Sequence, residues 1–192
     1  SYTSVSGKVY DLSQSQLRGK HNQRNMAQAI EALEFIGIKP YKIMENISSF
    51  KGLSHRMEYV ATVNGVDFIN DSKATNVDSV WYALDAMTQP VVWIAGGTDK
   101  GNDYEAIMPL VKNKVKHLVC LGIDNAKLRH SFGGMVKGIE EASSAEEAVN
   151  KALQAASKGD VVLLSPACAS FDLFKNYEDR GEKYKKAIKK LL

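Results

Sequence analysis

Three short runs of nearly unbroken apolar residues, separated by segments of helical periodicity, constrain this chain most. The runs are VVWIA from Val91, HLVCL from His117 and VVLL from Val161. Strands that are apolar on both faces are typical of a parallel sheet covered by helices on both sides. Because helical segments separate the runs, the sequence predicts a Rossmann-like α/β fold with a mostly parallel, doubly wound sheet.

The remaining elements of this fold follow from turn signals and periodicity. The pair Asn64-Gly65 predicts a hairpin between strands 57–62 and 66–70, which would add an antiparallel edge strand. Further strands are predicted at 91–95, 117–121, 136–139 and 161–164, and helices at 77–87, 104–113, 145–157 and 174–190.

The first fifty or so residues show a different pattern. Helices are predicted over 22–35 and from Pro40 to about residue 50, because apolar residues recur there at helical spacing. Short strand segments are predicted before them, from the alternation of Val5, Val9 and Leu12. This piece is too small to bury its own core. We therefore expect two domains, 1–52 and 53–192, the first being the remnant of a domain whose main body is missing.

Composition excludes several classes of protein. The chain of 192 residues has a formal net charge of +3, which does not indicate nucleic acid or a membrane surface as partner. No apolar run is long enough to cross a bilayer, and the polar start is not a signal peptide. Cys120 and Cys168 suggest neither disulfides nor a zinc site, and the histidines lack metal-ligand spacing. We expect a cytoplasmic monomer without a metal site of its own.

Ligands of open α/β sheets bind where strands end and helices begin, and three polar segments fall at such points. They are NDSKATN (70–76), GGTDKG (96–101) and LSPACASFDLF (164–174). Asp71 can accept hydrogen bonds from hydroxyls, and Lys73 and Lys100 can hold a phosphate or carboxylate. The alternatives are a capped loop, a glycine turn and a buried thiol at Cys168.

Two further clusters have side chains suited to a nucleotide. Arg56 in HRME can clamp a phosphate in bidentate fashion, although a surface ion pair with Glu58 is the alternative. Asn22 and Asn25 share one helical face, and helix capping explains only Asn22. The chain contains neither a P-loop nor a GxSxG motif. These residues alone indicate a nucleotide- or anion-binding α/β domain.

The same segments, in order from GKHNQRN to NYEDRG, resemble the motifs of the Mur ligase family. NDSKATN resembles the D-glutamate-adding branch, as do HRME, the glycine-rich loop ending at Lys100, and LSPACASFDLFKNYEDRG. The resemblance implies the end of a central ATPase domain followed by a whole C-terminal Rossmann-like domain. The P-loop, the magnesium-binding residues and a UDP-binding domain would then belong to the missing part.

This resemblance implies an ATP-driven amide ligase of peptidoglycan synthesis. The enzyme would join D-glutamate to UDP-N-acetylmuramoyl-L-alanine, with ATP and Mg²⁺ bound mainly by the missing central domain. No catalytic residue is expected in this portion, which alone should be inactive. The residues that the resemblance assigns to D-glutamate are Thr75, Lys100, Ser170 and Tyr177. Those that it assigns to the nucleotide are Asn22, Asn25, Arg56, Asp71 and Lys73.

Two positions depart from the pattern of some family members. Some members have Phe where Tyr177 stands, which puts a contact through the Tyr177 ring in doubt. Some have Asp where Thr98 stands, which puts a charge-based role at Thr98 in doubt. Two other functions stay open at this point: a stand-alone nucleotide-binding module, and a folate-type polyglutamate ligase.

Overall fold

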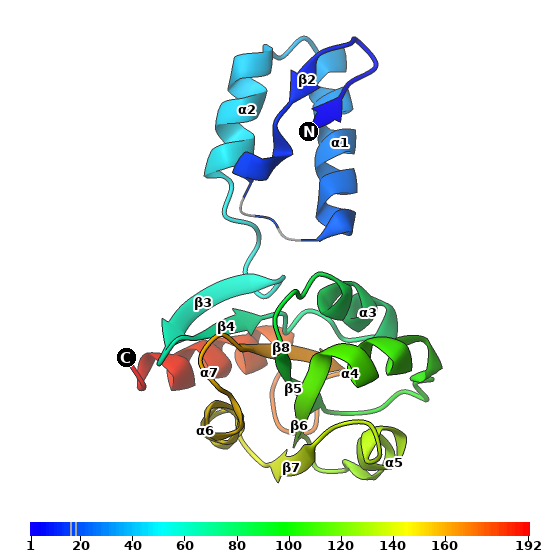
Figure 1. The fold of residues 1–192 in the computed structure, drawn as a ribbon, viewed down its shortest axis with the longest axis vertical. Helices are drawn as coiled ribbons and strands as arrows, with labels where there is room; N and C mark the ends of the chain where they lie inside the picture. Colours follow the sequence, from blue (N-terminus) through cyan, green and yellow to red (C-terminus); the bar gives the residue numbers. More distant parts are fainter. Residues whose placement is uncertain (16, 18) are drawn as a thin grey trace. The chain divides into compact units, whose positions relative to one another are not determined.

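The computed structural model describes residues 1–15, 17 and 19–192, which divide into two compact units (Figure 1). We call Ser1–Leu53 unit 1 and Ser54–Leu192 unit 2.

Unit 2 is built on a six-stranded sheet in the order β3-β4-β8-β5-β6-β7. β3 pairs antiparallel with β4, and the other neighbouring strands pair in parallel. The predicted fold class, with its antiparallel edge strand, is therefore confirmed. The strands are β3 Glu58–Val63, β4 Val66–Asn70, β5 Val91–Gly96, β6 Val115–Leu121, β7 Gly138–Ala142 and β8 Val161–Ala167.

Helices cover both faces of this sheet, as the apolar strands require (Figure 1). Along β5, Trp93 points to one core and its neighbours Val92 and Ile94 to the other. Side chains of α3, α4 and α5 complete the first core, and those of α6 and α7 complete the second. The helices are α3 Val77–Asp85, α4 Met108–Lys114, α5 Ala126–Phe132, α6 Ala145–Ala155 and α7 Tyr177–Lys189, and the 3₁₀ turn η2, Glu105–Ile107, precedes α4.

Two local features of unit 2 test the sequence predictions. The hairpin turn has positive φ at both Asn64 (53°) and Gly65 (78°), the conformation that Asn-Gly favours, so the predicted hairpin is confirmed. Helix α5 was not predicted. It has seven residues and buries only Leu128 and Phe132, so its apolar period is too short to recognise.

Unit 1 packs a small hairpin onto two helices. Its elements are β1 Tyr2–Thr3, β2 Val9–Tyr10, the 3₁₀ turn η1 Leu12–Gln14, α1 Lys20–Phe35 and α2 Pro40–Ser49. Strand segments were predicted here from Val5, Val9 and Leu12; Val9 lies in β2, Val5 in the turn before it and Leu12 in η1. Val5 and Val9 are 92% and 69% exposed, and Tyr10 is the buried residue of β2.

The two helices of unit 1 leave an apolar groove of about 500 Å³ between them. Met26 and Ile30 of α1 and Ile43 of α2 contribute to its lining, and Asn25 lies along it. Among the described residues, the core of this unit is formed by Tyr10, Ile30 and Ile43.

Candidate functional site

The strand order creates a point in unit 2 where loops diverge. β8 lies between β4 and β5, yet it leads to α7 on one face, whereas its neighbours lead to α3 and α4 on the other. Such a reversal opens a crevice at the carboxyl ends of the strands, which is where ligands of this architecture bind.

Backbone hydrogen bonds tie together the three loops at this edge. The amide of Ala167, the last residue of β8, donates to the carbonyl of Ala74, after β4, at 3.0 Å. Thr98, after β5, and Ala169 exchange two bonds of 2.8 and 3.2 Å. The loops that carry Thr75, Lys100 and Ser170 are therefore neighbours; Thr75 is half-buried, Lys100 exposed and Ser170 buried.

Gly97 allows the second and third of these loops to approach closely. A Cβ there would stand 2.1 Å from the carbonyl oxygen of Ala169, and its φ of 124° is a value that other residues rarely adopt. Asp99 then shapes the turn to Lys100 by accepting from the amides of Gly101 (2.7 Å) and Asn102 (3.0 Å).

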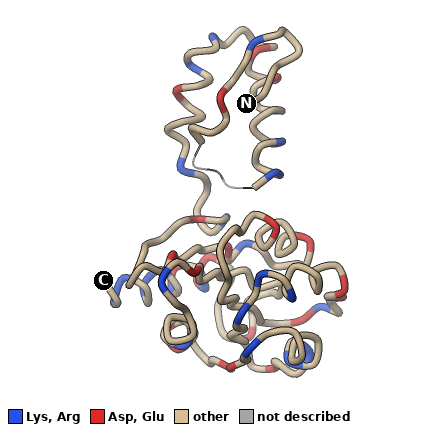
Figure 2. Tube along the Cα trace, viewed as in Figure 1, with Lys and Arg blue, Asp and Glu red and all other residues tan. Residues whose placement is uncertain are grey.

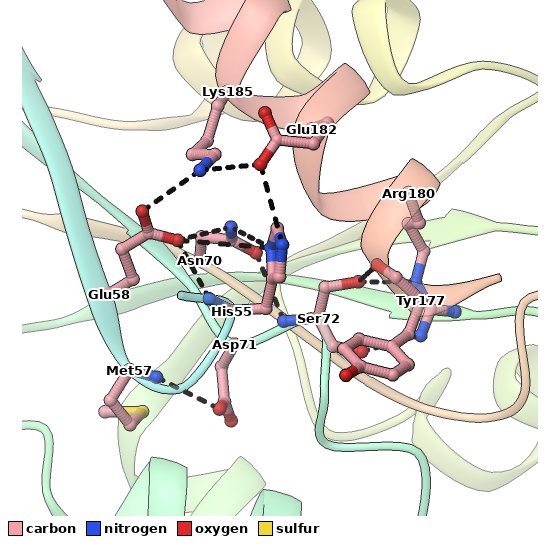
Figure 3. Close-up of polar contacts among 10 residues, drawn as sticks. All are labelled: His55, Met57, Glu58, Asn70, Asp71, Ser72, Tyr177, Arg180, Glu182 and Lys185. Atoms are coloured by element: carbon pink, nitrogen blue, oxygen red, sulfur yellow. Dashed lines mark hydrogen bonds and ion pairs between the residues drawn. The ribbon is translucent and has the colours of Figure 1, made fainter. Parts of the chain in front are cut away.

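Asp71 is a buried carboxylate, 7% exposed, at the end of β4. Its Oδ1 accepts from the amide of Met57 at 3.1 Å (Figure 3). Its Oδ2 accepts from the hydroxyl of Ser165 at 2.9 Å. Burial raises its pKa to about 7, against the opposing effects of these two bonds and of the charge on Arg56. A carboxylate has about four lone-pair positions, so it can accept further hydroxyls.

Lys73 and Tyr177 also meet at this edge. The Lys73 Nζ lies 3.8 Å from the centre of the Tyr177 ring, a cation–π contact. Arg56 is exposed and stands between two residues with left-handed backbone, His55 (φ 65°) and Met57 (φ 46°). Arg56, Asp71 and Lys73, three of the predicted nucleotide residues, thus belong to two connected loops, since Met57 donates to Asp71.

A buried arginine that was not predicted as a site residue anchors this region. Arg180 of α7 is 1% exposed, and its guanidinium donates to the hydroxyl (3.0 Å) and carbonyl (2.9 Å) of Ser72 and to the carbonyl of Cys168 (3.3 Å). The Ser72 hydroxyl in turn donates to the carbonyl of Tyr177 at 2.7 Å. Burial lowers the pKa of Arg180 to about 10. These contacts set the start of α7 against the loop after β4 (Figure 3).

A signal for Arg180 was present in the sequence. It lies four residues before Tyr184 and eight before Ile188, both buried, so it belongs to the apolar face of its helix. A cluster around His55 was also not predicted; Glu58 lies three residues along the chain, whereas Asn70, Glu182 and Lys185 come from distant segments (Figure 3).

The other two residues predicted to contact the nucleotide, Asn22 and Asn25, lie in unit 1. Asn22 and Asn25 occupy the first two turns of α1, and Asn25 lies along the apolar groove of unit 1. Their role at the nucleotide remains a prediction.

The described residues contain no group of three or more His, Cys, Asp or Glu side chains arranged to hold a metal ion. Within residues 1–15, 17 and 19–192, no helix is both long and apolar enough to cross a bilayer. In Figure 2, Lys and Arg are interspersed with Asp and Glu over unit 2.

Comparison with known proteins places this site in context. Residues 55–168 match the family described as "Mur ligase, glutamate ligase domain". The UDP-N-acetylmuramoylalanine–D-glutamate ligase of Cytophaga hutchinsonii is 56% identical over 172 residues, which cover 90% of this chain and 38% of that protein. The chain therefore spans well under half the length of this curated relative.

Solved structures share the fold at low sequence identity. UDP-N-acetylmuramate-alanine ligase MurC of Thermotoga maritima has a TM-score of 0.66 and 14% identity, over 92% of this chain and 39% of that one. Folylpolyglutamate synthase of Mycobacterium tuberculosis, complexed with ADP and AMPPCP, has a TM-score of 0.65 and 12% identity, over 92% and 41%.

Proposed function

Because the chain belongs to the Mur ligase family, we propose that it is the C-terminal portion of the ATP-dependent ligase that adds D-glutamate to UDP-N-acetylmuramoyl-L-alanine. The relative at 56% identity carries that name. The likeness to folylpolyglutamate synthase, at 12% identity, concerns the fold alone and gives no support to a folate substrate.

Each unit has its own part in this proposal. Unit 2, Ser54–Leu192, is the C-terminal domain that presents the amino acid. Unit 1, Ser1–Leu53, is the end of the central ATPase domain. The open apolar groove between α1 and α2 supports this second assignment over a stand-alone module, because complete domains rarely leave such surfaces uncovered.

One observation carries the assignment of D-glutamate: the loops after β4, β5 and β8 are hydrogen-bonded to one another. They bring Lys100 and the hydroxyls of Thr75 and Ser170 to one edge of the sheet. A cation and small donors at such an edge suit a dicarboxylic amino acid. Lys100 and Thr75 would hold its α-carboxylate, and Ser170 and Tyr177 its side-chain carboxylate.

The nucleotide would meet the neighbouring side chains. Arg56 would reach the phosphates, with Lys73 beside it, and Asp71 would accept from the ribose hydroxyls with its spare lone pairs. Asn22 and Asn25 of unit 1 would lie beside the adenine.

The reaction we propose is amide synthesis through an acyl phosphate. ATP phosphorylates the carboxylate of the UDP-muramoyl-alanine to give an acyl phosphate and ADP. The amine of D-glutamate then attacks the carbonyl carbon of the acyl phosphate, and phosphate leaves as the amide forms. This chain's residues bind and orient the amino acid and help exclude water, which would hydrolyse the acyl phosphate. Mg²⁺ would be held mainly by the central domain of the full-length enzyme. Dependence on ATP indicates a cytoplasmic reaction.

Phosphate release by the full-length enzyme tests this function. With UDP-N-acetylmuramoyl-L-alanine and ATP, we expect release with D-glutamate and at most background with L-glutamate or L-alanine, and none from the 192-residue chain alone. Lys100→Ala should raise KM for D-glutamate by about tenfold or more. Lys112→Ala removes an exposed lysine of α4 and serves as the control. Equal KM values in the two variants, or preference for another amino acid, would contradict the proposal.

A further inference from the structure

The side chain of His55 is enclosed in a ring of hydrogen bonds and ion pairs that has no role in the chemistry described above. The residue is 6% exposed. Its Nδ1 lies 3.0 Å from Nδ2 of Asn70, and its Nε2 lies 3.5 Å from Oε1 of Glu182. Lys185 bridges Glu182 (2.8 Å) and Glu58 (3.1 Å), and Glu58 accepts from Asn70 at 2.9 Å (Figure 3).

The orientation of the Asn70 amide determines which histidine nitrogen carries the proton. Its Oδ1 accepts from the backbone amide of Ser72 at 3.2 Å, so its NH₂ group faces the other way and donates to Glu58 and His55. A flipped amide would set its oxygen against the Glu58 carboxylate and its NH₂ against the Ser72 N–H, both repulsive.

His55 must then accept at Nδ1. A proton on that nitrogen would face the Asn70 donor, and Glu58 Oε2, at 4.0 Å from Nδ1, is too far to receive it. The proton of a neutral ring therefore stands on Nε2, directed at Glu182. The charged groups around the ring, from β3 and α7, are Glu58, Glu178, Glu182 and Lys185.

This ring of contacts fixes the segment that carries Arg56. The amide of His55 donates to Glu58 at 2.9 Å, and its carbonyl accepts from the amide of Lys73 at 3.0 Å. The imidazole and the Tyr177 ring pack in a T-shaped arrangement, with centroids 6.0 Å apart. It also lies over Gly181, where a Cβ would stand 2.2 Å from Nδ1, so only glycine fits there.

We propose that His55, as the neutral Nε2–H tautomer, is a positioning residue that holds Arg56 and Lys73 in the geometry needed for the nucleotide phosphates. This inference rests on the proposed function of those two cations. The inference adds to that function a residue that does not contact the nucleotide itself and acts through the backbone of its neighbours.

Two measurements test this role. Long-range ¹H–¹⁵N NMR of the 192-residue chain at pH 7.5 should show His55 protonated on Nε2 only, with exposed His130 as an internal reference. In the full-length enzyme, His55→Ala should raise KM for ATP by about tenfold and change kcat by less than about threefold, because a phosphate contact is lost equally in ground and transition states.

Two variants serve as controls. His55→Asn places an oxygen near the position of Nδ1 and tolerates a left-handed φ, so it should restore KM to within about threefold of the unsubstituted enzyme. His117→Ala removes a second histidine–glutamate pair, the partly exposed His117–Glu140, and should leave KM for ATP unchanged.

The outcomes separate the two proposals. A proton on Nδ1, or on both nitrogens, would overturn the tautomer, and KM values for His55→Ala that match those of His117→Ala would overturn the positioning role. An unsubstituted full-length enzyme without ligase activity would overturn the proposed function instead. The NMR measurement on this chain would still decide the tautomer.

Discussion

At the scale of single residues, Asp71 bears a carboxylate where burial opposes its charge. Burial raises its pKa to about 7, whereas an unfolded chain titrates this group near 3.8. The folded protein therefore binds the proton more tightly than the unfolded one. The tighter proton binding of Asp71 stabilises the folded state at low pH. As pH rises from about 4 to about 7, this stabilisation is lost, which lowers the free energy of unfolding by on the order of 3–4 kcal/mol.

Asp71→Asn should remove this dependence. The amide keeps the bond from Met57, and the Ser165 hydroxyl can turn to accept instead of donating. Urea unfolding at pH 4 and pH 7.5 should therefore show the variant close to the parent in acid and more stable at the higher pH. A stability difference that does not change with pH would contradict the expected titration.

Arg180 offers a second prediction at this scale. Its bonds end on neutral oxygens of Ser72 and Cys168, and they need the planar guanidinium fork. Arg180→Lys keeps the charge but leaves buried acceptors unpaired, so it should lower the free energy of unfolding by about 2–4 kcal/mol. Arg129→Lys, at an exposed ion pair with Glu141, should cost less than about 1 kcal/mol in the same urea titration.

At the scale of elements, helix α7 begins at the site, and its cap should matter for function as well as stability. Asn176 accepts from the amide of Asp179 at 2.8 Å, just as Ser144 caps α6 through Glu147 at 3.2 Å. Asn176→Ala and Ser144→Ala should each cost about 1 kcal/mol in thermal unfolding. Only Asn176→Ala should raise KM for D-glutamate in the full-length enzyme, since Tyr177 follows it.

The sequence predicted most of these elements because apolar strands and long amphipathic helices carry strong local signals. β5 and β8 begin at the predicted residues, Val91 and Val161. Helix α5 was not predicted because its two buried side chains are too few to show a helical period. Strand β7 runs over 138–142, whereas the prediction was 136–139.

The site residues that were not predicted make their contacts with residues far away in the sequence. Polar loop residues such as Asp71 and Lys100 stand out locally, because each follows a buried strand. The bonds from Arg180 to Ser72 and from Lys185 to Glu58 join residues separated by 108 and 127 positions. No spacing in the chain indicates such partners, which only the packing of α7 on the sheet brings together.

At the scale of the whole molecule, the two units differ in the size of their cores. Unit 1 buries Tyr10, Ile30 and Ile43, whereas unit 2 has an extensive core on each face of its sheet. Local stability follows buried apolar contact, so unit 1 should open more readily than unit 2.

Limited trypsin digestion should reveal this difference. Lys51 is exposed in the segment between α2 and β3, which has no regular structure. We expect early cleavage after Lys51 and accumulation of a fragment 52–192, identified by mass spectrometry. Lys51→Gln should delay its appearance. Accumulation of residues 1–51 instead would show that unit 1 is the more stable part.

The place of β8 at the centre of the sheet has a consequence for biosynthesis. A ribosome delivers β4 and β5 early, but the strand that fills the gap between them emerges about ninety residues after β4. Until then, the nascent chain exposes unpaired backbone N–H and C=O groups on the edges of β4 and β5, and these edges can pair with strands of other chains. Unit 2 should therefore acquire its native sheet only late in translation, and chains terminated before residue 161 should aggregate.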